Sequence, residues 1–122
     1  MLEGVAFSFR DCLDALRSAG TVITEADVIG GGSRSVTWIK ILASVLGITL
    51  HRLADGEHGA AFGAARLGRL AVTGEDPVSL CTPPRRLGSV LPDPALQNAY
   101  ETRFRLYRAL YPAMRAARAA GL

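Results

Sequence analysis

The chain has 122 residues, of which 49% are hydrophobic and 20% charged, which is the composition of one folded domain and too little chain for a complete two-domain enzyme. Fourteen basic residues against eleven acidic ones leave a net charge of +3, and the basic residues are scattered along the chain, which disfavours nucleic-acid binding. No stretch approaches the 18 apolar residues of a membrane span, and the two cysteines have no metal-binding spacing. We therefore expect a cytoplasmic protein that binds no nucleic acid, membrane or metal.

Apolar residues at spacings of three and four predict an amphipathic helix that ends at Gly20. Its predicted buried stripe consists of Leu2, Val5, Phe9, Cys12, Leu13 and Leu16. Cys12 would then be a buried free thiol. The helical pattern is already running at Met1, without an N-cap residue, which suggests that the chain has been cut from a longer protein.

A strand, a glycine loop and a helix are predicted next. Residues 28–29 read as strand after an acidic turn, residues 30–35 as the loop, and residues 36–46 as a helix that stops at a glycine. A second β-rich run covers residues 48–53, and a helix of small residues follows from 57 to about 71. A crossover of this length makes the two strands parallel. Because parallel sheets are normally covered on both faces, we expect the first helix and the small-residue helix to provide that cover.

The remainder of the chain is predicted to contain no further strand. Residues 76–94 hold five of the six prolines and read as an irregular connection. A long helix then begins at Pro94, with an apolar stripe that continues until Pro112 kinks or ends it. Two strands alone do not make a stable parallel sheet, so we expect the missing strands to lie outside this chain.

Gly30, Gly31 and Gly32 form the strongest candidate site. Glycines between a strand and a helix let a ligand lie against bare backbone, and the helix N-terminus adds free N–H groups and partial positive charge. Ligands of open α/β sheets bind at the carboxyl ends of the strands, where this loop and the turn at 54–56 both fall. The loop is neither a P-loop nor a dinucleotide fingerprint, because Ser35 stands where the last glycine would be. The alternative is a tight turn with Ser35 as helix N-cap.

Other polar residues carry weaker signals. Asp55, Glu57 and His58 could form an acid–base set, but a turn with Asp55 capping the next helix is favoured. His51 has no partner visible in the sequence, and Trp38 fits a helical core position. We predict neither catalytic residues nor metal ligands in this chain.

An ordered series of motifs resembles the C-terminal part of the FGGY family of carbohydrate kinases, and most of all its xylulokinase members. The motifs are Leu2–Phe7, Ile29–Ser35, Gly56–Leu67, Phe104–Tyr107 and Leu110–Pro112. The resemblance covers nearly the whole chain. It implies an actin-like, ribonuclease-H-like α/β fold, of which residues 1–122 would be a single partial domain that binds nucleotide.

The resemblance also implies a function. The parent protein would use ATP, with Mg, to convert the ketopentose D-xylulose to D-xylulose 5-phosphate and ADP. The backbone of Gly30, Gly31 and Gly32 would line the adenosine, and Ser35 would contact adenine. The family's phosphate-binding Asp-Gly-Thr hairpin, sugar-binding groups and general base have no counterpart here.

We therefore expect the isolated chain to be inactive and to self-associate or pair with the missing domain. The competing hypothesis is a free-standing, non-catalytic interaction module, in which the glycine loop is only a turn.

Overall fold

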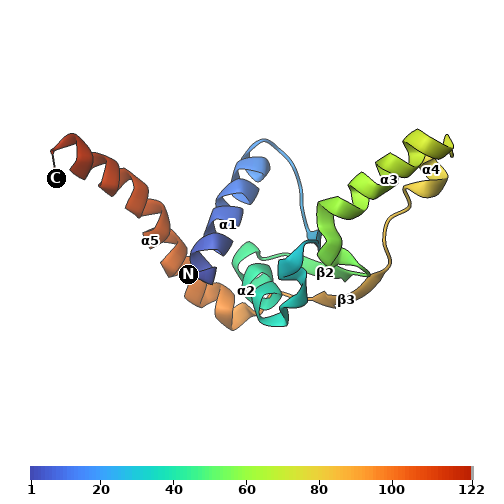
Figure 1. Cartoon of the computed structure of the whole chain (residues 1–122). Helices are drawn as coiled ribbons and strands as arrows, with labels where there is room; N and C mark the ends of the chain where they lie inside the picture. The colour runs from blue at the N-terminus through green and yellow to red at the C-terminus, as the bar shows by residue number, and fades with distance from the viewer. Residues whose placement is uncertain (122) are drawn as a thin grey trace.

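A computed structural model describes residues 1–121, which form a three-stranded sheet and several helices (Figure 1). In chain order the elements are α1 (Leu2–Ser18), β1 (Glu25–Val28), the 3-10 turn η1 (Gly31–Arg34), α2 (Val36–Leu46), β2 (Thr49–Leu53), the 3-10 turn η2 (Gly56–His58), α3 (Gly59–Thr73), α4 (Pro77–Leu80), β3 (Arg86–Val90) and α5 (Pro94–Ala119). None of the helices within residues 1–121 has the length and apolar character needed to span a membrane.

The sheet has the order β1-β2-β3. Strands β1 and β2 are parallel, which confirms the prediction from the crossover, and β3 runs antiparallel to β2. The prediction that no strand follows β2 is therefore wrong. The prolines of this segment flank the strand, so none removes a donor from its hydrogen-bonded ladder. Strand β1 also begins earlier than predicted, because the acidic residues that read as a turn alternate with core residues.

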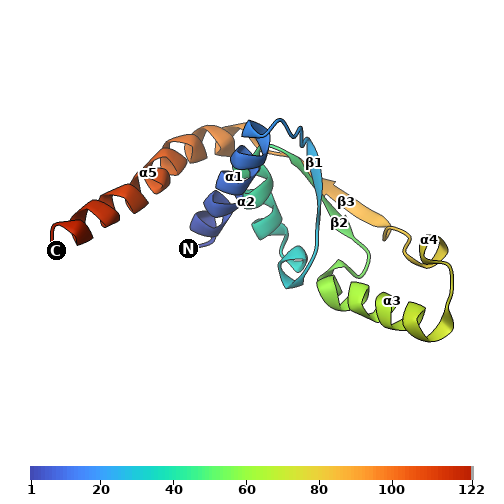
Figure 2. The ribbon, with the colours of Figure 1, turned by 90° about the horizontal axis from the view of Figure 1, so that it is seen from above.

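The two faces of the sheet differ in chemistry because successive side chains of a strand point to opposite faces. The face packed toward the core carries Ala26, Val28, Leu50 and Val90. The other carries Glu25, Asp27, His51 and Ser89. Helix α3 does not cover a face: none of its residues is buried, and Figure 2 shows it projecting from the sheet. The predicted cover by the first helix and α3 is therefore wrong: α3 covers neither face, and α1 packs mainly on α2 and α5, while α2 contacts β2 and β3.

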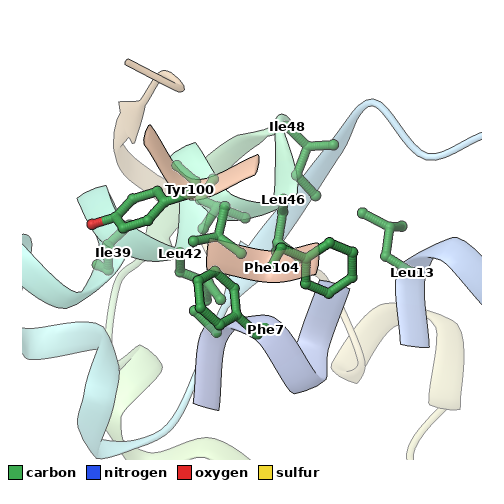
Figure 3. Close-up of a cluster of buried hydrophobic side chains, with 12 residues drawn as sticks. Phe7, Leu13, Ile39, Leu42, Leu46, Ile48, Tyr100 and Phe104 are labelled. Atoms are coloured by element: carbon green, nitrogen blue, oxygen red, sulfur yellow. The ribbon is translucent and has the colours of Figure 1, made fainter. Parts of the chain in front are cut away.

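The core lies where α1, α2 and the first half of α5 come together beside the sheet (Figure 3). The Phe7 ring is 6.1 Å from Tyr100, 5.8 Å from Phe104 and 5.6 Å from Tyr107, measured between centroids. Trp38 is half-buried against this cluster, in keeping with its predicted position. These aromatic contacts fasten the first helix of the chain to the last.

The buried face of α1 differs from the predicted stripe. Helix α1 buries Ala6, Phe7 and Leu13, so of the predicted stripe only Leu13 is inside. The other members are exposed: Leu2, Val5, Phe9, Cys12 and Leu16. Because α1 is apolar on two sides and packs on α2 and α5 through only one of them, the predicted burial of the Cys12 thiol is wrong.

Helix α5 begins at Pro94 as predicted, but it does not end at Pro112. The Asp93 carboxylate caps it by accepting hydrogen bonds from the N–H groups of Ala95 and Leu96, and the bond from Leu96 contributes most to lowering the pKa of Asp93. The helix continues through Pro112, and its second half extends away from the other helices and the sheet (Figure 1). Tyr111 and Met114 of the predicted stripe are consequently 69% and 67% exposed.

Candidate functional site

Two loops lie against each other at the carboxyl ends of the parallel strands. The first, from Gly30 to Ser35, follows β1, and the second, from Ala54 to Gly59, follows β2. The Gly30 N–H donates to the Gly56 carbonyl oxygen at 2.7 Å. A Cβ on Gly59 would stand 3.4 Å from the Gly30 backbone, so glycine permits this close approach. The two strand ends that the sequence singled out therefore form one edge.

The three glycines of the first loop have different surroundings. Gly30 has a φ of +86°, a conformation that favours glycine. A Cβ on Gly32 would lie 3.1 Å from the indole nitrogen of Trp38, whereas a Cβ on Gly31 would meet nothing within 4 Å. A Cβ on Gly30 would also meet nothing, but Gly30 has a positive φ and is only half-exposed, so Gly31 is the exposed position of the loop that can take a side chain without backbone strain.

Ser35 is the N-cap of α2. Its Oγ accepts a hydrogen bond from the Trp38 N–H at 3.2 Å, which confirms the capping role considered for it. The helix closes at Gly47, whose φ of +67° is the left-handed ending that glycine favours. Both ends of α2 thus follow from local sequence signals, and together they fix where the loop meets the helix.

The second loop does not assemble the considered acid–base set. Asp55, Glu57 and His58 are exposed, and none makes a side-chain hydrogen bond within residues 1–121. Asp55 adopts a left-handed φ of +56° and does not cap α3, so its predicted capping role is wrong. The intervening turn η2 moves the N-cap position to His58.

A polar network on the open face of the sheet was missed from sequence. The His51 ring Nδ1 lies 2.8 Å from Ser89 Oγ, and its Nε2 lies 3.0 Å from a Glu25 carboxylate oxygen. Arg86 donates to the other Glu25 oxygen at 3.0 Å and to Asp27 at 2.9 Å. Three strands meet in these contacts. The sequence signals this network only through Glu25 and Asp27, two carboxylates two residues apart, because its other members depend on the unpredicted strand β3.

Glu25 should make the stability of the sheet depend on pH. Hydrogen bonds from His51 and then from Arg86 lower its pKa below the ordinary value of 4.5. A carboxylate with a lowered pKa stabilises the fold above its ordinary pKa, and this contribution is lost as the pH falls through the folded-state value. We expect Glu25→Gln to lower the Tm at pH 7 and to have progressively less effect below pH 4.5.

Thermal unfolding followed by circular dichroism at pH 7 and at acidic pH measures this. Glu57→Gln, an exposed carboxylate without a side-chain partner within the described residues, is the control and should leave the Tm unchanged. A Tm difference for Glu25→Gln that stays constant as the medium is acidified would contradict the argument.

Comparison with known proteins identifies the family to which this chain belongs. Residues 1–72 match the model of the FGGY family of carbohydrate kinases, C-terminal domain. Among curated relatives, the chain is 36% identical over 112 residues to the xylulose kinase of Escherichia coli K12, covering 91% of this chain and 23% of that protein. It is 27% identical over 113 residues to the Bacillus subtilis xylulose kinase, covering 91% and 22%.

The similar solved structures are also kinases of this kind. A xyloylose kinase from Brucella ovis superimposes with a TM-score of 0.77 at 51% identity, covering 95% of this chain and 24% of that one. The xylulose kinase from Rhodospirillum rubrum gives 0.68 at 30% identity, covering 94% and 24%. The chain thus spans about a quarter of the length of these relatives. It belongs to the FGGY family of carbohydrate kinases, matches the C-terminal domain model of that family over residues 1–72, and has part of their actin-like ATPase fold.

Proposed function

We propose that this chain forms the adenosine-binding wall of an ATP-dependent, xylulokinase-like sugar kinase. The reaction would transfer the γ-phosphate of ATP to D-xylulose, giving D-xylulose 5-phosphate and ADP. The observation that carries the proposal is the exposed glycine loop at the carboxyl ends of two parallel strands, in a chain that belongs to a family of carbohydrate kinases.

The residues of the loop suit the proposed roles. Gly31 presents open backbone on which a nucleoside can lie. Gly30 supplies the positive φ that the loop requires, and Gly32 leaves room for the Trp38 indole. The Ser35 oxygen accepts from the Trp38 N–H, so its own O–H is left to donate to a ring nitrogen of adenine. Mg²⁺ would accompany the ATP phosphates and be held outside this loop, which has no carboxylate between residues 30 and 35.

Residues 1–122 would be one partial domain of the kinase. In this proposal the phosphate-binding hairpin, the sugar-binding groups and the general base belong to the part of the relatives that the chain does not span, which is about three quarters of their length. Phosphoryl transfer needs positioned phosphates, metal and acceptor together, so these 122 residues alone should transfer no phosphate.

A chimera tests the function. The chain replaces the matching part of the E. coli xylulose kinase, and ATP-dependent phosphorylation of D-xylulose is measured for the chimera and for the 122-residue chain alone. We expect turnover by the chimera and none by the chain. A folded chimera without turnover argues for the non-catalytic interaction module, which would not restore a kinase. Turnover by the chain alone would overturn the partial-domain proposal.

We also propose that the isolated chain self-associates, in place of pairing with the missing domain. Its accessible surface is 8267 Å², against about 6,300 Å² for a compact monomer of 12.9 kDa. Many large hydrophobic side chains are exposed on this surface, including Val5 and Phe9 on the outer side of α1. An exposed apolar face of this kind favours association.

Sedimentation velocity over a range of concentrations tests this. We expect Phe9→Glu to shift the chain toward monomer. Leu67→Glu, which also replaces an exposed apolar residue with a charged one but lies on α3, should have less effect. A chain that stays a compact monomer at every concentration would contradict the proposal.

A further inference from the structure

The network on the open face of the sheet depends on an irregular register between β2 and β3. His51 pairs with Ser89 and Arg52 with Gly88, but Leu53 pairs with Arg86 instead of Leu87. In a regular ladder Arg86 would point to the opposite face, because side chains alternate along a strand. The irregularity turns Arg86 onto the face where His51 and the carboxylates of β1 lie, which is a known use of bulges.

Arg86 reaches over the central strand to the far one. Its side chain belongs to β3, yet its hydrogen bonds at 3.0 and 2.9 Å go to Glu25 and Asp27 on β1. His51 on β2 fills the space between, bonded to Glu25 on one side and to Ser89 on the other. The three strands are thus joined by side chains as well as by their backbones, through charge-assisted bonds that are stronger than neutral ones.

The bonded strands lead directly into the two loops of the candidate site. Strand β1 ends two residues before Gly30, and β2 ends three residues before Gly56. Next to Arg86, the Arg85 carbonyl accepts a hydrogen bond from the Ala54 N–H at 2.8 Å, which holds the start of the second loop. A sliding of β1 against β2 would therefore separate the Gly30 N–H from the Gly56 carbonyl.

We propose that Arg86, with Glu25 and His51, is a positioning clamp that sets the glycine loop against the second loop and so shapes the adenosine wall. Within residues 1–121 the side-chain hydrogen bonds of the clamp go to strand residues and not to the loops, so the clamp acts through the register of β1. The inference rests on the proposed function only for the nucleotide; the positioning of the loop can be tested without it.

The test measures hydrogen exchange by NMR at two amides of the chain. The Gly30 amide reports on the contact between the loops, and the Gly47 amide, bonded to the Ala43 carbonyl at the far end of α2, is the reference. In Arg86→Gln we expect Gly30 to exchange about tenfold faster while Gly47 is unchanged, since the lost bonds loosen only the sheet edge that leads to the loop. Arg86→Lys, which can pair with one carboxylate at a time, should lie between.

Arg69→Gln is the matched control. Arg69 also makes a two-nitrogen contact to an exposed carboxylate, that of Glu75, but it lies on α3 away from the clamp, so both amides should keep their rates. Equal acceleration of Gly30 and Gly47 in Arg86→Gln, or no change at Gly30, would overturn the proposal. If Arg86→Gln does not fold, Glu25→Gln is measured in the same way with the same expectation. Because no nucleotide is added, failure of the clamp and failure of the proposed function give separate results.

Discussion

Replacing Phe104 with alanine should lower the free energy of unfolding by about 3–5 kcal/mol, the usual cost of removing a buried phenylalanine. The ring is 4% exposed, packs on Phe7, and lies 4.5 Å beneath the Arg10 guanidinium. A domain of this size has roughly 5–15 kcal/mol in total. The loss would therefore leave much of the population unfolded, or with α5 detached from α1.

Leu106→Ala on the same helix is the control. Leu106 is 65% exposed, so its truncation should change the free energy of unfolding by no more than about 0.5 kcal/mol. Urea unfolding followed by circular dichroism measures both variants. Equal destabilisation by the two substitutions would mean that the aromatic cluster is not what holds α5 in place.

Replacing Gly31 with leucine in the active chimera should raise the KM for ATP by roughly 10–100-fold, the equivalent of one or two lost hydrogen bonds to the nucleotide. A Cβ at Gly31 meets nothing within 4 Å, so a side chain there starts into open space and should not disturb the loop. The space that it fills is the place where the adenosine is proposed to lie. The KM for D-xylulose should be unchanged, because in the proposed function the sugar-binding groups belong to the part of the relatives that this chain does not span.

Gly31→Ala provides the graded comparison, since its single methyl group should raise the KM for ATP much less. Thermal unfolding of the isolated chain carrying Gly31→Leu should give the Tm of the unsubstituted chain. An unchanged KM for ATP in Gly31→Leu would remove this loop from the nucleotide site, even if the chimera remained an active kinase.

The parts of the fold that the sequence predicted are those governed by local chemistry. Ser35 and Gly47 mark the ends of α2 because a capping hydroxyl and a left-handed glycine act within a few residues of themselves. The parallel pairing of β1 and β2 follows from the length of the crossover between them. The glycine loop lies at the carboxyl end of β1 because it directly follows that strand in the sequence.

The parts that could not be predicted depend on distant neighbours. Residues 86–90 contain a glycine and lack alternation, and they become a strand only by pairing with β2. The network around His51 depends on that pairing, because Arg86 and Ser89 lie on β3, so the network could not be predicted without the strand. Helix α1 has apolar residues on two sides, and which side is buried depends on α2 and α5. Whether the candidate loop binds a nucleotide is still a prediction.

The aromatic cluster also dictates when this domain can fold during synthesis. Phe7 is made before its partners Phe104 and Tyr107, which lie about a hundred residues later in the chain. At about 5–20 residues per second, Phe7 waits on the order of 5–20 s before these partners are made. Helix α2 can cover part of the buried side of α1 early, but the surface around Phe7 stays uncovered until α5 is made. A ribosome that stalls before α5 would therefore release a chain prone to aggregate.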